Sequence, residues 1–101
     1  MACPTIEELR DRRLSAMSAD ERAEFDEALA VARLALEVGE KVRDAREAAG
    51  LTQRDLAARM STSQAAVARL EAGRTSATLT TLQRVAAALD MTITINLAQP
   101  H

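Results

Sequence analysis

Apolar residues recur at helical spacing along most of the chain, and the spacing changes to a strict alternation only in one short segment. Five stretches have the three- and four-residue spacing of an amphipathic helix, and hydroxyl residues suited to N-caps precede several of them. Residues 91–97 alternate apolar and polar side chains, with β-branched residues at the centre, which is typical of a strand. The pattern therefore predicts helices over residues 6–17, 18–49, 52–60, 63–71 and 78–90, followed by a strand over 91–97.

Residues 52–71 are the most informative part of the chain and have the sequence TQRDLAARMSTSQAAVARLE. Thr52 and Asp55 form a capping-box pattern at the start of the first helix. Hydroxyl residues at 61–63 interrupt the helical pattern, because their side chains compete for backbone hydrogen bonds, and Gly73 is a natural helix stop. In the second helix Val67 and Leu70 face inward, which leaves Gln64, Ala65, Ala68 and Arg69 facing outward. Two short helices joined in this way form a helix-turn-helix, which places one helix in the DNA major groove.

Residues 51–90 resemble the helix-turn-helix domain of the Cro/C1 repressor family, with the sequence LTQRDLAARMSTSQAAVARLEAGRTSATLTTLQRVAAALD. The overall layout is also similar to that of HigA-type antitoxins, which carry an N-terminal extension and end in a β-strand. The resemblance implies an all-α fold: a five-helix Cro/C1-type domain with an N-terminal helical extension and a short C-terminal β-strand that pairs across a dimer. One departure is Ser61, which stands in the turn where the family usually has glycine. A left-handed backbone there would cost about 1–2 kcal/mol.

The outward face of the second short helix supplies the candidates for reading DNA bases. Gln64 can bond adenine N6 and N7, and Arg69 can bond guanine O6 and N7, each worth about 1–3 kcal/mol of discrimination. Ala65 and Ala68 can contact a thymine methyl group. Other interpretations remain open: Arg69 as a phosphate contact, and Gln64 as a solvent-facing residue. The resemblance implies that the start of the first helix and the residues around the second contact phosphates, which here are Gln53, Ser63, Arg74 and Thr75.

The long predicted helix carries two apolar stripes, and a small domain needs to bury only one of them. The second stripe therefore indicates a partner surface, unless the first short helix folds back and covers it with Ile6, Leu9 and Met17. The resemblance to HigA-type antitoxins implies a small ribonuclease toxin as the partner, expected to be basic. The first stripe is Ala28, Val31, Ala35, Val38, Val42, Ala45 and Ala49, and the candidate toxin-binding stripe is Phe25, Leu29, Ala32 and Leu36.

The predicted strand has no second strand in the chain to pair with. An exposed edge recruits another chain, and the simplest partner is the same strand of a second copy, antiparallel across a two-fold axis. A core rich in alanine, with one Phe and no Trp or Tyr, also favours a dimer, because a monomer would bury little area. The predicted dimerisation residues are Met91, Ile93, Ile95 and Leu97. A near-palindromic DNA site, with half-sites about one helical turn apart, would match such a dimer.

Charge and composition narrow the expected function. The net charge is −2, but residues 1–50 carry −4 and residues 51–101 carry +2, so the basic excess lies where DNA is expected to bind. Arg54, Arg59 and Arg84 belong to this excess and read either as DNA contacts or as a solvated face. The chain has one cysteine, Cys3, one histidine, His101, and three glycines, and it lacks the constellations of a metal, cofactor or catalytic site. We therefore do not expect an enzyme. No apolar run can span a bilayer and no signal peptide is evident, so a cytoplasmic protein is expected.

The sequence thus predicts a helical extension over residues 1–36, a DNA-binding domain over 37–90, a dimerisation strand over 91–97 and a tail over 98–101. The expected function is a sequence-specific DNA-binding antitoxin that binds and neutralises a small ribonuclease toxin and represses its own operon. The alternative is a free-standing repressor with no toxin partner, in which the extension only enlarges the core or the dimer interface.

Overall fold

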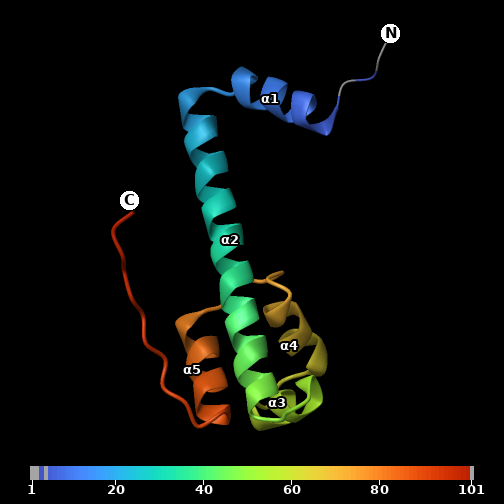
Figure 1. Ribbon diagram of the computed structural model, residues 1–101, viewed down its shortest axis with the longest axis vertical. Helices are drawn as coiled ribbons and strands as arrows, with labels where there is room; N and C mark the ends of the chain where they lie inside the picture. The colour runs from blue at the N-terminus through green and yellow to red at the C-terminus, as the bar shows by residue number, and fades with distance from the viewer. Residues whose placement is uncertain (1–2, 4, 101) are drawn as a thin grey trace. The chain divides into compact units, whose positions relative to one another are not determined.

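The computed structural model describes residue 3 and residues 5–100, apart from the side chain of Leu14, so His101 lies outside the described residues. Within these residues the chain is all-helical and forms five α-helices (Figure 1). It divides into two compact units, one reaching as far as Val31 and the other beginning at Ala32. No helix among the described residues is both long and apolar enough to cross a lipid bilayer. The helices are α1 (Ile6–Ala16), α2 (Ala19–Ala48), α3 (Gln53–Arg59), α4 (Gln64–Glu71) and α5 (Leu79–Ala88).

Each helix begins at a hydroxyl side chain, as the sequence predicts. In every case the side-chain oxygen accepts a hydrogen bond from the backbone N–H three residues later, which satisfies one of the free donors at a helix start. At α3 the capping box is complete, because the Asp55 carboxylate in turn accepts from the Thr52 N–H at 2.9 Å. The capping residues of α1 to α5 are Thr5, Ser18, Thr52, Ser63 and Thr78.

Four helices end in the same way, with one residue in the left-handed backbone region. These residues are Gly50, Ser61, Gly73 and Asp90. Each is followed by a residue whose N–H donates back to the carbonyl five positions earlier, the long bond of a Schellman motif. The predicted left-handed turn at Ser61 is therefore present, with φ 56°. Its backbone strain is offset by the hydrogen bonds that this ending provides.

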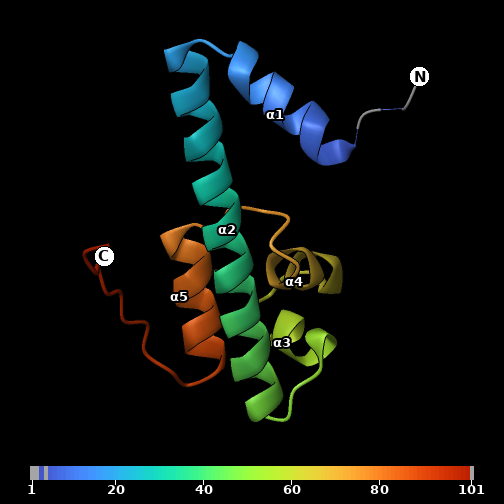
Figure 2. The ribbon, with the colours of Figure 1, turned by 45° about the horizontal axis from the view of Figure 1, so that its top comes forward.

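The hydrophobic core lies in the unit that begins at Ala32. The helices α3, α4 and α5 gather around the last part of α2 (Figures 1 and 2). Leu56 and Val67 are the largest fully buried side chains, and Leu70, predicted like Val67 to face inward from α4, is buried as well. The core residues are Val42, Leu56, Ala57, Met60, Val67, Leu70, Val85 and Leu89.

Helix α2 continues without a break through Gly39, which is buried against the end of α4. A methyl group on Gly39 would lie 2.5 Å from the carbonyl oxygen of Glu71 and 2.6 Å from that of Leu70. The backbones of α2 and α4 are therefore too close for any side chain at this position. Glycine is unfavourable within a helix by about 1 kcal/mol, so the close approach explains a residue that looks like a weak point in the sequence.

In the unit that ends at Val31, the apolar side chains are only partly covered. Phe25 and Leu29 are half-buried, whereas Ile6 and Leu9 on α1 are exposed. Ile6 and Leu9 therefore do not cover the second stripe, whereas Met17, the third residue of that alternative, is itself half-buried. Few apolar side chains in this unit leave the solvent, so burial contributes little to its stability.

Residues 91–100 follow α5 as an extended segment without regular secondary structure (Figure 1). The strand predicted over 91–97 is thus not formed in the single chain. The physical reason is that a strand takes its backbone hydrogen bonds from a neighbouring strand, and the described part of the chain provides none. The apolar residues of the segment stay exposed, from 37% at Ile93 to 94% at Leu97.

Candidate DNA-binding site

The helix pair α3–α4 is held by local backbone bonds at its turn. The N–H of Thr62 donates to the Ala57 carbonyl at 2.9 Å, which ends α3, and Ser63 starts α4 directly afterwards. Ala57 is buried, as expected of a small side chain at the crossing of two helices. The turn therefore fixes the direction in which α4 leaves α3.

Helix α4 has one buried face and one exposed face. Val67 and Leu70 are buried in the core. Gln64, Ala65 and Arg69 are exposed and Ala68 is half-buried, so these side chains form a ridge along the outer side of the helix. Small residues between the two long ones let a helix approach another surface closely. The ridge has the form of a major-groove reading surface.

The C-terminal end of α4 is anchored to α2. The Glu71 side chain is buried and accepts two hydrogen bonds from the Arg46 guanidinium, at 2.7 Å and 2.9 Å. This bidentate contact raises the pKa of Arg46 above its usual value. Leu36 lies against Gly73, whose added Cβ would be 2.8 Å from a Leu36 methyl. Together with the contact at Gly39, these interactions fix one end of α4 and leave its N-terminal end, with Gln64, at the surface.

A protein-family model described as helix-turn-helix matches residues 42–96, just over half of the chain. The chain belongs to the Cro/C1-type helix-turn-helix family. It is accordingly a DNA-binding transcription regulator, and α4 is the second helix of its helix-turn-helix, the position that the recognition helix takes in such motifs. No curated protein and no solved structure matches the chain significantly.

The predicted phosphate contacts of this helix-turn-helix lie in two places. Gln53 and Ser63 are near the starts of α3 and α4, whereas Arg74 and Thr75 follow the end of α4. Gln53 is half-buried and its amide nitrogen donates to Glu71 at 3.2 Å, which leaves one N–H for another acceptor. The Ser63 oxygen accepts the capping bond, and its own hydrogen remains free to donate. Arg74 and Thr75 are exposed.

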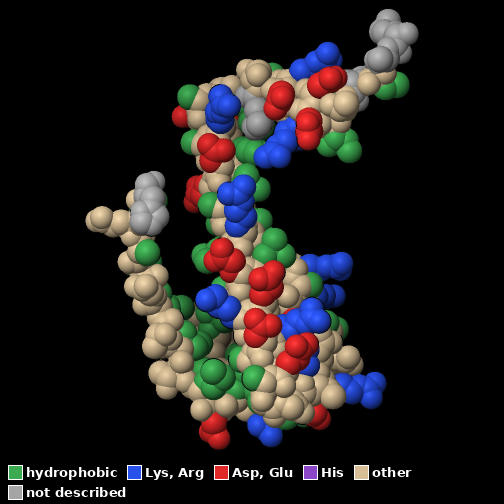
Figure 3. All heavy atoms as spheres, viewed as in Figure 1, with side chains coloured by type: hydrophobic (Ala, Val, Ile, Leu, Met, Phe, Trp, Pro, Cys, Tyr) green, Lys and Arg blue, Asp and Glu red, His purple; other side chains and the backbone are tan. Residues whose placement is uncertain are grey.

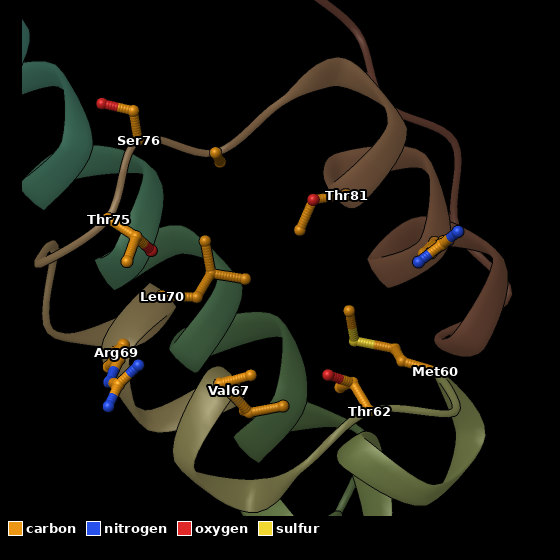
Figure 4. Close-up of a pocket in the computed structure, with 11 residues that line it drawn as sticks. Met60, Thr62, Val67, Arg69, Leu70, Thr75, Ser76 and Thr81 are labelled. Carbon is orange, nitrogen blue, oxygen red and sulfur yellow. The ribbon is translucent and has the colours of Figure 1, made fainter.

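A pocket of about 300 Å³ lies between α4, the loop after it and α5 (Figure 4). Figure 4 shows Arg69 on the side of the pocket opposite Met60. The apolar lining comes from Met60, Ala66, Val67, Leu70 and Ala77. No carboxylate lines the pocket. Arg69, which is predicted to read a base, and Thr75, which is predicted to contact a phosphate, both line this pocket. Its polar lining comes from Thr62, Arg69, Thr75, Ser76, Thr81 and Arg84.

The acidic residues of the helix-turn-helix are largely committed to internal contacts. Glu71 is paired with Arg46, and Asp55 accepts the capping bond from Thr52. The backbone and side-chain bonds from Thr52 hold the pKa of Asp55 below its usual value, with the nearby Arg59 adding to the effect. In Figure 3 acidic side chains on the visible face are mixed with basic ones along α2, while the side chains that project beside α4 are basic. The surface around α4 therefore keeps its positive charge for an anionic partner.

The sequence pattern did not predict several contacts of this site. It did not identify Arg46 as the partner of Glu71, which is 25 residues away, or the bond that Arg46 also donates to the Leu51 carbonyl. It also did not foresee that Arg54 donates to Gln64 across the turn, at 3.2 Å. Arg59, read as either a contact or a solvated residue, donates to the Ala88 carbonyl at 3.1 Å. No sequence pattern marks such pairs, because each joins residues from different helices.

Proposed function

We propose that the protein is a sequence-specific repressor that binds DNA as a homodimer, with Gln64 and Arg69 reading base edges. The observation that carries this proposal is the division of α4, in which Val67 and Leu70 are buried while Gln64 and Arg69 are exposed. A ridge of this composition fits the major groove, where Gln and Arg discriminate adenine and guanine. In this proposal Ala65 and Ala68 contact thymine methyl groups, and phosphates are contacted by Gln53, Ser63, Arg74 and Thr75.

The dimer is proposed to form through residues 91–97. Met91, Ile95 and Leu97 are more than half exposed, which leaves an apolar, extended segment with unpaired backbone groups. Pairing this segment antiparallel with its copy would satisfy those groups and cover its apolar side chains, Ile93 included. Two recognition helices related by a two-fold axis would then meet a near-palindromic operator.

We further propose an antitoxin role, with a small basic ribonuclease toxin as the second partner. The acidic first half of the chain, at −4, is complementary to such a toxin. Phe25, Leu29 and Ala32 are half-buried or exposed and so are accessible to a partner. Leu36 is half exposed, although part of its side chain packs on Gly73. The alternative is a free-standing repressor. It is favoured if the product of the adjacent reading frame does not co-purify with the chain.

Binding assays on variants of the ridge test the DNA-reading proposal. Duplexes selected by the wild-type protein from a random pool serve as the specific probe. Gln64→Ala and Arg69→Ala should each raise the Kd for the selected duplex about tenfold or more, because each removes a base-reading side chain. Affinity should also fall steeply as the salt concentration rises.

Gln83→Ala is the matched control, since Gln83 is an exposed residue of α5 outside the ridge. Its Kd should equal that of the wild type. If Gln64→Ala and Arg69→Ala both bind the selected duplex like this control, the recognition ridge is assigned to the wrong residues.

A further inference from the structure

Arg54 and Gln64 meet across the turn of the helix-turn-helix. Arg54 is the second residue of α3, and Gln64 is the first residue of α4. The Arg54 Nε donates to the Gln64 Oε1 at 3.2 Å, and both side chains are exposed. Among the described residues Arg54 forms no ion pair, so this contact is not a by-product of a nearby carboxylate. The bond therefore concerns the base-reading side chain itself.

The chemistry of the two groups fixes the orientation of the amide. A glutamine side chain can turn either its oxygen or its nitrogen toward a neighbour, but an arginine carries only donors. Arg54 can therefore bond only the oxygen of Gln64. The Gln64 nitrogen, with two N–H donors, then points away from Arg54. One lone pair of the oxygen also remains free for a base.

The neighbouring residue of α3 is engaged elsewhere. The amide nitrogen of Gln53 donates to the buried Glu71 carboxylate, at 3.2 Å. Arg46 donates to the same carboxylate, so Gln53 is tied to the anchor at the end of α4. At the start of α3 the side chain bonded to Gln64 is accordingly that of Arg54.

We propose that Arg54 is a positioning residue for sequence readout, which holds the Gln64 amide so that its nitrogen donates to the N7 atom of a purine in the major groove. This inference rests on the proposed function, because it requires Gln64 to contact a base. Its physical basis is pre-organisation: a side chain already held in its bound orientation loses less freedom on binding. The two Nη groups of Arg54 are not used in the bond with Gln64 and can contact a phosphate at the same time.

A double-mutant cycle on Arg54 and Gln64 tests this inference. The probes are the selected duplex and a set of duplexes in which each base pair is replaced in turn. The preference at a base pair is the ratio of the Kd for the replaced duplex to the Kd for the selected duplex. Gln64→Ala should lower this ratio about tenfold at one base pair per half-site. Arg54→Ala should lower the ratio at that same base pair by about threefold or more, and leave the ratios at the other base pairs unchanged. In the Gln64→Ala background, Arg54→Ala should change no preference further.

Arg74→Ala is the charge-matched control, because it removes an exposed arginine that follows α4 and is proposed to contact a phosphate. It should weaken binding to every duplex alike and reduce the salt dependence by about one released ion. If Arg54→Ala behaves in this way in both backgrounds, Arg54 is a phosphate contact and the positioning role is refuted while the proposed function stands. If Gln64→Ala changes no preference, Gln64 reads no base and the positioning role is refuted, while the proposed function as a whole fails only if Arg69→Ala also leaves binding unchanged.

Discussion

The two parts of helix α2 have the same apolar stripe but different surroundings. Val31 and Val42 both belong to the first stripe, yet Val31 is 48% exposed and Val42 is 6% exposed. Val42 packs in the core with residues of the helix-turn-helix, whereas Val31 lies in the unit that contains α1. The difference teaches that helical spacing identifies which face of a helix is apolar but not how much of that face the same chain will cover.

The largest expected effect comes from the anchor between α2 and α4. Glu71→Ala would leave the Arg46 guanidinium, whose side chain is 11% exposed, with only the more distant and exposed Glu47 carboxylate, 3.9 Å away. Removing one partner of a buried ion pair destabilises by about 3–5 kcal/mol, and because Glu47 compensates part of the remaining charge we expect a loss of about 3 kcal/mol. Urea unfolding followed by circular dichroism, at one fixed protomer concentration, measures this loss.

Arg43→Ala is the control for that measurement. Arg43 pairs with Glu47 on the same helix, but its side chain is 63% exposed. An exposed ion pair of this kind contributes about 0.5 kcal/mol or less. If the Glu71→Ala and Arg43→Ala variants lose similar amounts of stability, α2 does not anchor the recognition helix through Arg46.

The second expected effect concerns the closest approach of α2 to α4. Gly39→Ala should lower the free energy of unfolding by about 2–3 kcal/mol, because the new methyl group meets two backbone carbonyls that cannot turn aside. Gly50→Ala is the comparison: its added Cβ has no atom within 4 Å, and only its φ of 72° is unfavourable. That variant should lose about 1 kcal/mol. Thermal unfolding of both variants separates crowding from backbone strain, and equal losses would show that Gly39 is not packed as described.

The sequence predicted the elements whose determinants are local. The hydroxyl caps, the stop at Gly73 and the left-handed turn at Ser61 each depend on a few adjacent residues, and each is present. The sequence predicted the long helix α2 but not its close packing against α4, because Gly39 is explained by carbonyl groups more than thirty positions away.

The segment 91–97 shows a different limit. Its alternating pattern predicts a strand correctly only if a partner strand exists, and the pattern does not say where that partner comes from. At the site, the spacing of α4 predicted which side chains are outward. It could not predict the bonds from Arg54 to Gln64 or from Gln53 to Glu71, since these depend on how two helices meet.

The smallest expected effect is also the most direct test of the contrast along α2. Val42→Ala removes two buried methyl groups and should lower the free energy of unfolding by about 2 kcal/mol, from lost burial and the cavity that remains. Val31→Ala makes the same chemical change on the same helix at an exposed position, and should lower it by less than about 0.5 kcal/mol. Urea titrations of the two variants under identical conditions compare them.

A larger loss for Val31→Ala than for Val42→Ala would mean that the part of α2 around Val31 is covered in solution. Repeating both titrations over a range of protomer concentrations then identifies the cover. A loss that grows with concentration would assign it to a second copy of the chain, because binding to the folded state adds stability by mass action. With Val31 exposed, as in the structure, the difference between the two variants should stay constant at every concentration.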